Sequence, residues 1–96
     1  MSPKNKIKLN FLRKKLDNLD IQLLKIFKER TEIIKKVLSL KAYKKEIVDK
    51  KRISIILKKI KKESLKRNID PKITHRIWKN IIWSYINFEK KNFKKK

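Results

Sequence analysis

The chain has no cysteine and no glycine, and it carries a single histidine, His75. The first absence excludes disulfide bonds and thiolate chemistry, and the shortage of histidine argues against a His-rich metal site. No apolar run approaches the roughly 18 residues of a membrane span, and the N-terminus lacks the apolar core of a signal peptide. We therefore expect a cytoplasmic protein with no metal site and no membrane partner.

Acidic residues are also scarce, nine against 31 Lys and Arg, which gives a formal net charge of +22 in 96 residues. Such a charge is typical of proteins that bind nucleic acid. However, Lys, Ile and Asn are abundant while Ala and Gly are almost absent, which is the pattern that A/T-rich codons produce. The lysines are spread over all faces without helix-turn-helix spacing or an RNA-stacking motif. We interpret most of them as solvated surface residues, and a basic helical dimer that binds nucleic acid stays as the distant alternative.

Arginine is rare in this chain, so the positions that keep it are informative. A guanidinium binds carboxylates through two parallel hydrogen bonds, which a lysine cannot do. These positions are therefore candidates for binding an anionic ligand. The five are Arg13, Arg30, Arg52, Arg67 and Arg76.

The stretch from Leu9 to Lys41 predicts one long helix, for which Ser2-Pro3 and Asn10 are both possible caps. Its apolar residues recur at steps of three and four and so form a single stripe, which Arg30 interrupts. At 1.5 Å per residue this helix is about 50 Å long, whereas a compact domain of this size is about 35 Å across. We therefore expect a second copy to cover the stripe. The stripe comprises Leu9, Leu12, Leu16, Leu19, Leu23, Ile26, Ile33, Val37 and Leu40.

Two more helices are expected after a connector at residues 42–48. Asp49 is a candidate N-cap for the second helix, which should end near Asn68. Asp70-Pro71 predicts the start of the third helix, because an acidic cap is followed by proline at the first helical position. The fold class is thus all-α, with three helices in one domain, residues 1–96, and frayed tails at 1–8 and 94–96. We expect the aromatic residues of the third helix and its end to form core: Trp78, Trp83, Tyr85, Phe88 and Phe93.

Several charged residues lie on or beside the apolar stripes. In an antiparallel pair of first helices, Arg13 of one chain would approach Arg30 and Lys41 of the other and form a cationic pocket. Glu89 falls on the apolar face of the third helix. Each residue alone also fits a plain surface role, since Lys41 or Arg52 can extend to solvent and Glu89 can pair with a nearby lysine.

Taken together, these residues resemble the all-helical chorismate mutases over about residues 9–93. The resemblance rests on Leu12-Arg13, Glu29-Arg30, Lys41, Asp49 to Arg52, Ile69-Asp70-Pro71 and Glu89. It implies an intertwined homodimer with two sites, each lined by both chains. Arg30 and the other chain's Arg13 would then hold the two carboxylates of the substrate, and Lys41 and Glu89 would face its ether oxygen. By the same resemblance, Arg52, Asp49, Ile53, Tyr85 and Ile86 would line the substrate.

The implied reaction needs no cofactor and no metal, because chorismate rearranges to prephenate in one concerted pericyclic step. Positioned cations and hydrogen-bond donors suffice to stabilise the charge that develops on the ether oxygen.

Two features resemble a related branch, the isochorismate pyruvate lyases. Mutases usually have Glu where this chain has Ile53, and the connector from Lys41 to Arg52 is short. The segment Ile81 to Ile86 is also similar to that branch. The substrate is therefore either chorismate or isochorismate, and we place the mutase first because it is the more broadly needed activity.

Overall fold

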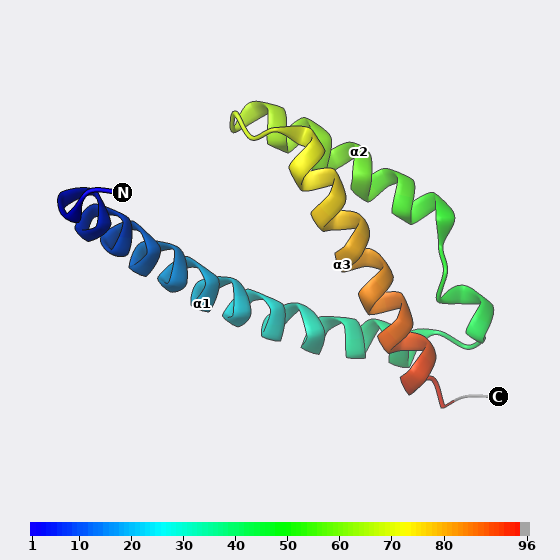
Figure 1. The fold of residues 1–96 in the computed structure, drawn as a ribbon. Coiled ribbons are helices and arrows are strands. Elements are labelled where there is room, and N and C mark those ends of the chain that lie inside the picture. Colours follow the sequence, from blue (N-terminus) through cyan, green and yellow to red (C-terminus); the bar gives the residue numbers. More distant parts are fainter. Residues whose placement is uncertain (95–96) are drawn as a thin grey trace. The chain divides into compact units, whose positions relative to one another are not determined.

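The computed structural model describes residues 1–94 and is built from helices (Figure 1). In chain order they are α1 (Pro3–Leu40), the 3₁₀ helix η1 (Lys44–Glu46), α2 (Lys50–Lys66) and α3 (Pro71–Asn92). No strand occurs in this part of the chain. The predicted all-α class, with the first helix much the longest, is confirmed.

Helix α1 begins at Pro3, which is the earlier of the two predicted caps and lies ahead of the apolar stripe that starts at Leu9. Residues 3–8, which we expected to fray, are helical because nothing after Pro3 interrupts the turn. Ser2 also caps this end, since its Oγ accepts a hydrogen bond from the backbone N–H of Asn5 at 3.2 Å. At the other terminus, residues 95–96 of the expected frayed tail lie outside the described residues.

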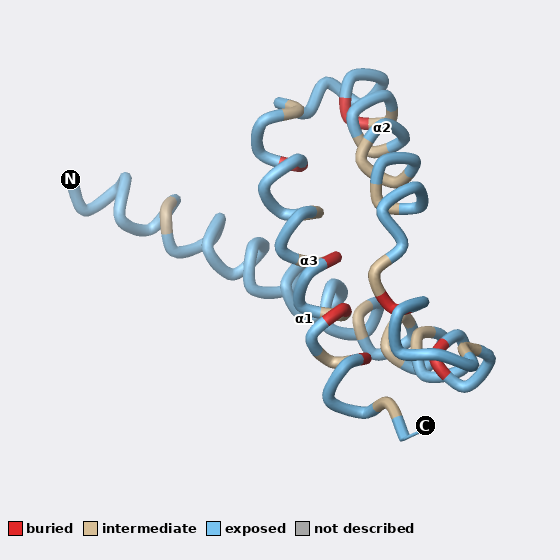
Figure 2. Tube along the Cα trace, turned by 90° about the vertical axis from the view of Figure 1, so that its right-hand side faces the viewer, coloured by how far each residue is buried: buried red, intermediate tan, exposed pale blue. Residues whose placement is uncertain are grey.

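The chain divides into two compact units, Met1–Ile33 and Ile34–Lys96, with α1 continuing through the boundary. In the first unit no residue is buried, and Figure 2 shows α1 there almost entirely in the colour of exposed residues. The predicted apolar stripe is thus open to solvent in the single chain. Its exposed members in this unit are Leu12, Leu16, Leu19, Leu23, Ile26 and Ile33.

The second unit contains the hydrophobic core. Helices α2 and α3 are joined by a short turn and pack against each other (Figure 1). Four buried residues form the core cluster: Leu38 from the last turn of α1, Ile47 from the connector, and Ile82 and Ile86 from α3. Partly buried side chains pack around this cluster, and they are Val48, Ile53, Ile56, Leu57 and Phe93.

The predicted start and end of α2 and the predicted start of α3 are confirmed. Asp49 caps α2, because its carboxylate accepts a hydrogen bond from the backbone N–H of Arg52 at 3.0 Å. Asn68 ends the α2 region with a φ of 55°, in the left-handed region that asparagine tolerates. Asp70 accepts from the backbone N–H of Lys72 at 2.9 Å, and Pro71 is the first residue of α3.

The aromatic prediction was wrong for Trp83, which is 44% exposed. The other four aromatic residues of this set are half-buried. Trp83 directly follows Ile82, and successive residues on a helix are turned by about 100°. The rotation that buries Ile82 in the core therefore directs Trp83 to the outside.

Candidate functional site

Lys41 and Glu89 form an ion pair inside the second unit. The Lys41 ammonium lies 3.3 Å from Oε1 and 3.2 Å from Oε2 of Glu89, so it donates to both carboxylate oxygens. The side chains are 20% and 7% exposed, respectively. Burying a carboxylate is costly unless it is paired, and this cation supplies the compensating charge.

The core cluster positions both members of this pair. Lys41 immediately follows α1, and its backbone N–H donates to the carbonyl of the buried Leu38 at 3.1 Å. Glu89 lies three residues after Ile86 and seven after Ile82, so it continues the buried face of α3. The pair therefore lies beside the core, where water has limited access to the carboxylate.

The other predicted site residues of the second unit have different surroundings. Tyr85 is half-buried, and its ring meets Phe88 edge-to-face with centroids 6.4 Å apart. Ile86 belongs to the core cluster, and Ile53 packs against it. The side chain of Asp49 caps α2. Arg52, in the first turn of α2, is exposed.

Arg13 and Arg30 both lie on α1 in the first unit, where Arg13 is exposed and Arg30 is half-buried. Seventeen residues separate them (30 − 13), which is about 25 Å along a helix axis. The two guanidinium groups of one chain therefore cannot bind the same small dicarboxylate.

The sequence profile of the family described as "Chorismate mutase type II" matches residues 12–90. This range covers most of the chain and all of the site residues discussed above. The chain belongs to the type II chorismate mutase family. No curated protein and no solved structure gives a significant match to it.

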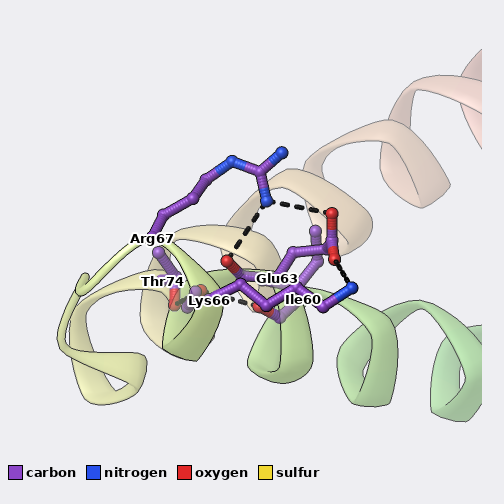
Figure 3. Close-up of polar contacts among 6 residues, drawn as sticks. Ile60, Glu63, Lys66, Arg67 and Thr74 are labelled. Carbon is purple, nitrogen blue, oxygen red and sulfur yellow. Dashed lines mark hydrogen bonds and ion pairs between the residues drawn. The ribbon is translucent and has the colours of Figure 1, made fainter.

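Helix α2 of this chorismate mutase family member ends in a polar cluster that sequence analysis missed (Figure 3). Glu63 Oε1 accepts from Arg67 Nη1 at 2.9 Å, and Glu63 Oε2 lies 3.4 Å from the Lys66 ammonium. The hydrogen bond from Arg67, together with the positive charge of Lys66, lowers the pKa of the Glu63 carboxyl below its ordinary value.

A buried pair of hydroxyl groups links α2 to α3 next to this cluster. Ser64 Oγ lies 2.7 Å from Thr74 Oγ1, and Ser64 also donates to the carbonyl of Ile60 at 2.6 Å. Both residues are buried. The signal in the sequence is that Ser64 lies four residues after Ile60 and seven after Leu57, and so occupies an apolar position of the α2 face.

The part of the chain that the structure describes contains no group of three or more His, Cys, Asp or Glu side chains that could hold a metal ion. None of the helices in residues 1–94 is long and apolar enough to cross a membrane. What the candidate site of this family member does offer is a cation and a carboxyl group held together at the edge of a core. The ammonium of such a pair can bind an anion and donate a hydrogen bond to it.

Proposed function

We propose that this chain is a chorismate mutase, which rearranges chorismate to prephenate within an intertwined homodimer. The observation that carries the proposal is the Lys41–Glu89 pair, at 3.2 Å and largely shielded from solvent, inside the range that matches the family. The Lys41 ammonium is a donor for the negative charge that develops on an ether oxygen, and Glu89, which accepts from Lys41 in the structure, becomes a second donor only in its protonated form.

The chemistry fits these two side chains. As the C–O bond of chorismate breaks, negative charge gathers on the ether oxygen, and a positioned donor there stabilises the transition state by about 3–4 kcal/mol. Lys41 supplies a full positive charge. Glu89 supplies a hydrogen bond when its carboxyl group is protonated. A rate enhancement of about 10⁶ corresponds to roughly 8 kcal/mol, which two donors and the positioning of the carboxylates can provide.

A second copy of the chain supplies the second arginine that is needed to bind both carboxylates of the substrate. Arg13 and Arg30 are about 25 Å apart on one helix, but antiparallel pairing of two α1 helices would bring Arg13 of one chain toward Arg30 of the other. The half-exposed leucine stripe of α1 supports this pairing, because covering the exposed half of each leucine with the second copy is favourable by about 1 kcal/mol. Each site would then use Arg30, Lys41, Arg52 and Glu89 of one chain and Arg13 of the other.

One experiment tests the activity directly. The purified protein is incubated with chorismate and with isochorismate in separate reactions, and the products are identified by chromatography against a protein-free control. We expect prephenate from chorismate, at a rate that Lys41→Met abolishes. Lack of turnover of both substrates would refute the proposal.

The second candidate is an isochorismate pyruvate lyase, which would release pyruvate and leave salicylate. It is supported by Ile53, which is half-buried against the core cluster and offers no hydrogen-bond acceptor for the ring hydroxyl of chorismate. Salicylate and pyruvate from isochorismate, with chorismate unchanged, would establish the lyase in place of the mutase. Either activity can rely on the same cations.

A further inference from the structure

Trp83 is a large aromatic side chain that the core does not use. It is 44% exposed, although it lies next to the buried Ile82 on α3. An indole buries a large apolar area when it packs against other groups, so leaving it in solvent forgoes that stabilisation. The residues around it show what it could bind.

Trp83 lies in the middle of a row of exposed polar and cationic side chains. The row follows steps of four, three, four, four and three residues, so its members lie along one side of α3. All of them are exposed. We call this row the α3 basic stripe, and it consists of Lys72, Arg76, Lys79, Trp83, Asn87 and Lys90.

The positive charge of the α3 basic stripe is not compensated. The only acidic residue of α3 is Glu89, which is buried and paired with Lys41. Asp70, just before the helix, accepts a hydrogen bond from the backbone of Lys72. Within residues 1–94, none of the four stripe cations forms an ion pair. Four positive charges thus extend over 18 residues, about 27 Å of helix, with an indole between them.

We propose that the α3 basic stripe binds single-stranded nucleic acid. Cations that follow the phosphate backbone, combined with an exposed aromatic ring on which a base stacks, are the usual means of such binding. Lys79 lies one turn before Trp83, and Arg76 and Lys90 lie two turns to either side. A base stacked on the indole therefore has a cation within reach of the phosphates that flank it in both directions.

Other partners fit this surface less well. In a duplex the bases are already stacked on both sides, so the indole would have no free base to contact. A membrane-surface helix needs a broad apolar face, whereas the positions one turn to either side of Trp83 are Lys79 and Asn87. An acidic peptide would pair with the cations but would gain little from an aromatic ring among them. The combination favours unpaired bases.

The stripe and the proposed active site are separable. Trp83 is turned by about 100° from Ile82, whereas Glu89 continues the buried face on which Ile82 lies. Substitutions in the stripe should therefore leave turnover of chorismate unchanged, and the failure of one proposal does not affect the other.

The first experiment asks whether a base contacts Trp83. A Trp78→Phe protein retains Trp83 as its only tryptophan, and its fluorescence is recorded during titration with a 12-residue oligothymidylate. We expect quenching upon binding. In anisotropy titrations with the same labelled oligonucleotide, Trp83→Ala should weaken binding about tenfold, because stacking of one base contributes at this scale. Trp83→Phe should restore part of the affinity.

The matched control for the aromatic ring is Phe11→Ala, which removes another exposed ring, in the first unit. It should leave the affinity unchanged. Equal loss in the two alanine variants, or no loss in either, would overturn the proposal. Dissociation of a dimer by Trp83→Ala, measured by sedimentation without oligonucleotide, would also overturn it, because Trp83 would then belong to a protein interface.

The second experiment separates the stripe from the general positive charge of the protein. Each phosphate contact contributes about −0.7 to the slope of log K against log salt for a single strand. The double variant Lys79→Ala/Lys90→Ala should therefore reduce the slope by about 1.4. The control variant Lys58→Ala/Lys62→Ala removes the same amount of charge from exposed positions of α2 and should leave the salt slope unchanged.

Three further ligands complete the test: a 12-base-pair duplex, poly-glutamate and anionic phosphatidylserine vesicles. We expect each to bind more weakly than the single strand and to leave the Trp83 fluorescence unquenched. Quenching of equal depth by any of them would assign the stripe to that class of partner and overturn the proposal, as would identical salt slopes for the two double variants.

Discussion

Replacement of Lys41 should lower the free energy of unfolding more than replacement of Glu89 does. Lys41→Met leaves the Glu89 carboxylate, 7% exposed, without its cation. Removing one partner of a buried ion pair lowers the free energy of unfolding by about 3–5 kcal/mol. We expect a decrease of about 3 kcal/mol for Lys41→Met, because Lys41 lies at the edge of the core. Glu89→Gln leaves the ammonium, which is 20% exposed and can extend toward water. The amide oxygen of the glutamine can still accept its hydrogen bond, so the expected loss is about 1 kcal/mol.

The assay is urea unfolding followed by circular dichroism. All proteins are compared at one concentration, because the stability of a dimer depends on the concentration of its chains. The double variant Lys41→Met/Glu89→Met is the decisive control. It removes both charges and fills their space with apolar side chains, so it should be at least as stable as the wild type. If Lys41→Met were as stable as the wild type, or the double variant as unstable as Lys41→Met, the ion pair would not be buried in solution.

The remaining predictions concern shared sites, substrate choice and pH. Arg13→Ala and Arg30→Ala proteins, each inactive alone, should regain activity when mixed and refolded, because one site of the heterodimer inherits neither defect; no recovery would contradict a site shared between chains. Ile53→Glu should accelerate chorismate turnover by supplying an acceptor worth about 1–3 kcal/mol, and unchanged turnover beside rapid cleavage of isochorismate would favour the lyase. Glu89→Gln keeps a hydrogen-bond donor at this position, so it should retain chorismate turnover, whereas Glu89→Ala should lose it; a Glu89→Gln protein as inactive as Glu89→Ala would contradict a donor role for this residue. Because Arg67 and Lys66 lower the pKa of Glu63, the Glu63 carboxylate stabilises the folded state at neutral pH, and this contribution is lost as the pH falls through the lowered pKa. The melting temperature of Glu63→Gln should thus lie below that of the wild type at pH 7, and the two should converge as the pH falls through the lowered pKa of Glu63; a gap that persists in acid would show that the charge is not responsible.

The helix ends could be predicted because their causes are local. A cap such as Asp49, or the Asp70-Pro71 pair, acts on backbone groups within three residues of itself, so the sequence alone contains the relevant information. The same applies to Asn68, whose left-handed conformation depends on its own side chain.

Contacts between distant residues could not be obtained in this way. Helical periodicity placed Glu89 correctly on the apolar face of α3, but it does not bring Lys41, 48 residues away, beside it. Only the resemblance to the chorismate mutases predicted that Lys41 and Glu89 face the same point of one site. The Ser64–Thr74 bond depends on the packing of α2 on α3, which helical periodicity does not specify. Trp83 is a different case, because counting its angle from Ile82 would have placed it outside the core.

Glu89 is the one charged side chain among the buried residues of the described chain, and stability alone does not explain it. An apolar residue at this position would continue the face formed by Ile82 and Ile86, and apolar replacements of buried ion pairs are often neutral or stabilising by about 1–4 kcal/mol. The residues that a protein retains at a cost in stability are commonly those its activity needs. The Lys41→Met/Glu89→Met protein tests this reasoning, since we expect it to be as stable as the wild type and inactive toward chorismate and isochorismate. A double variant that retains turnover would mean that the pair is structural and that the donors for the ether oxygen lie elsewhere.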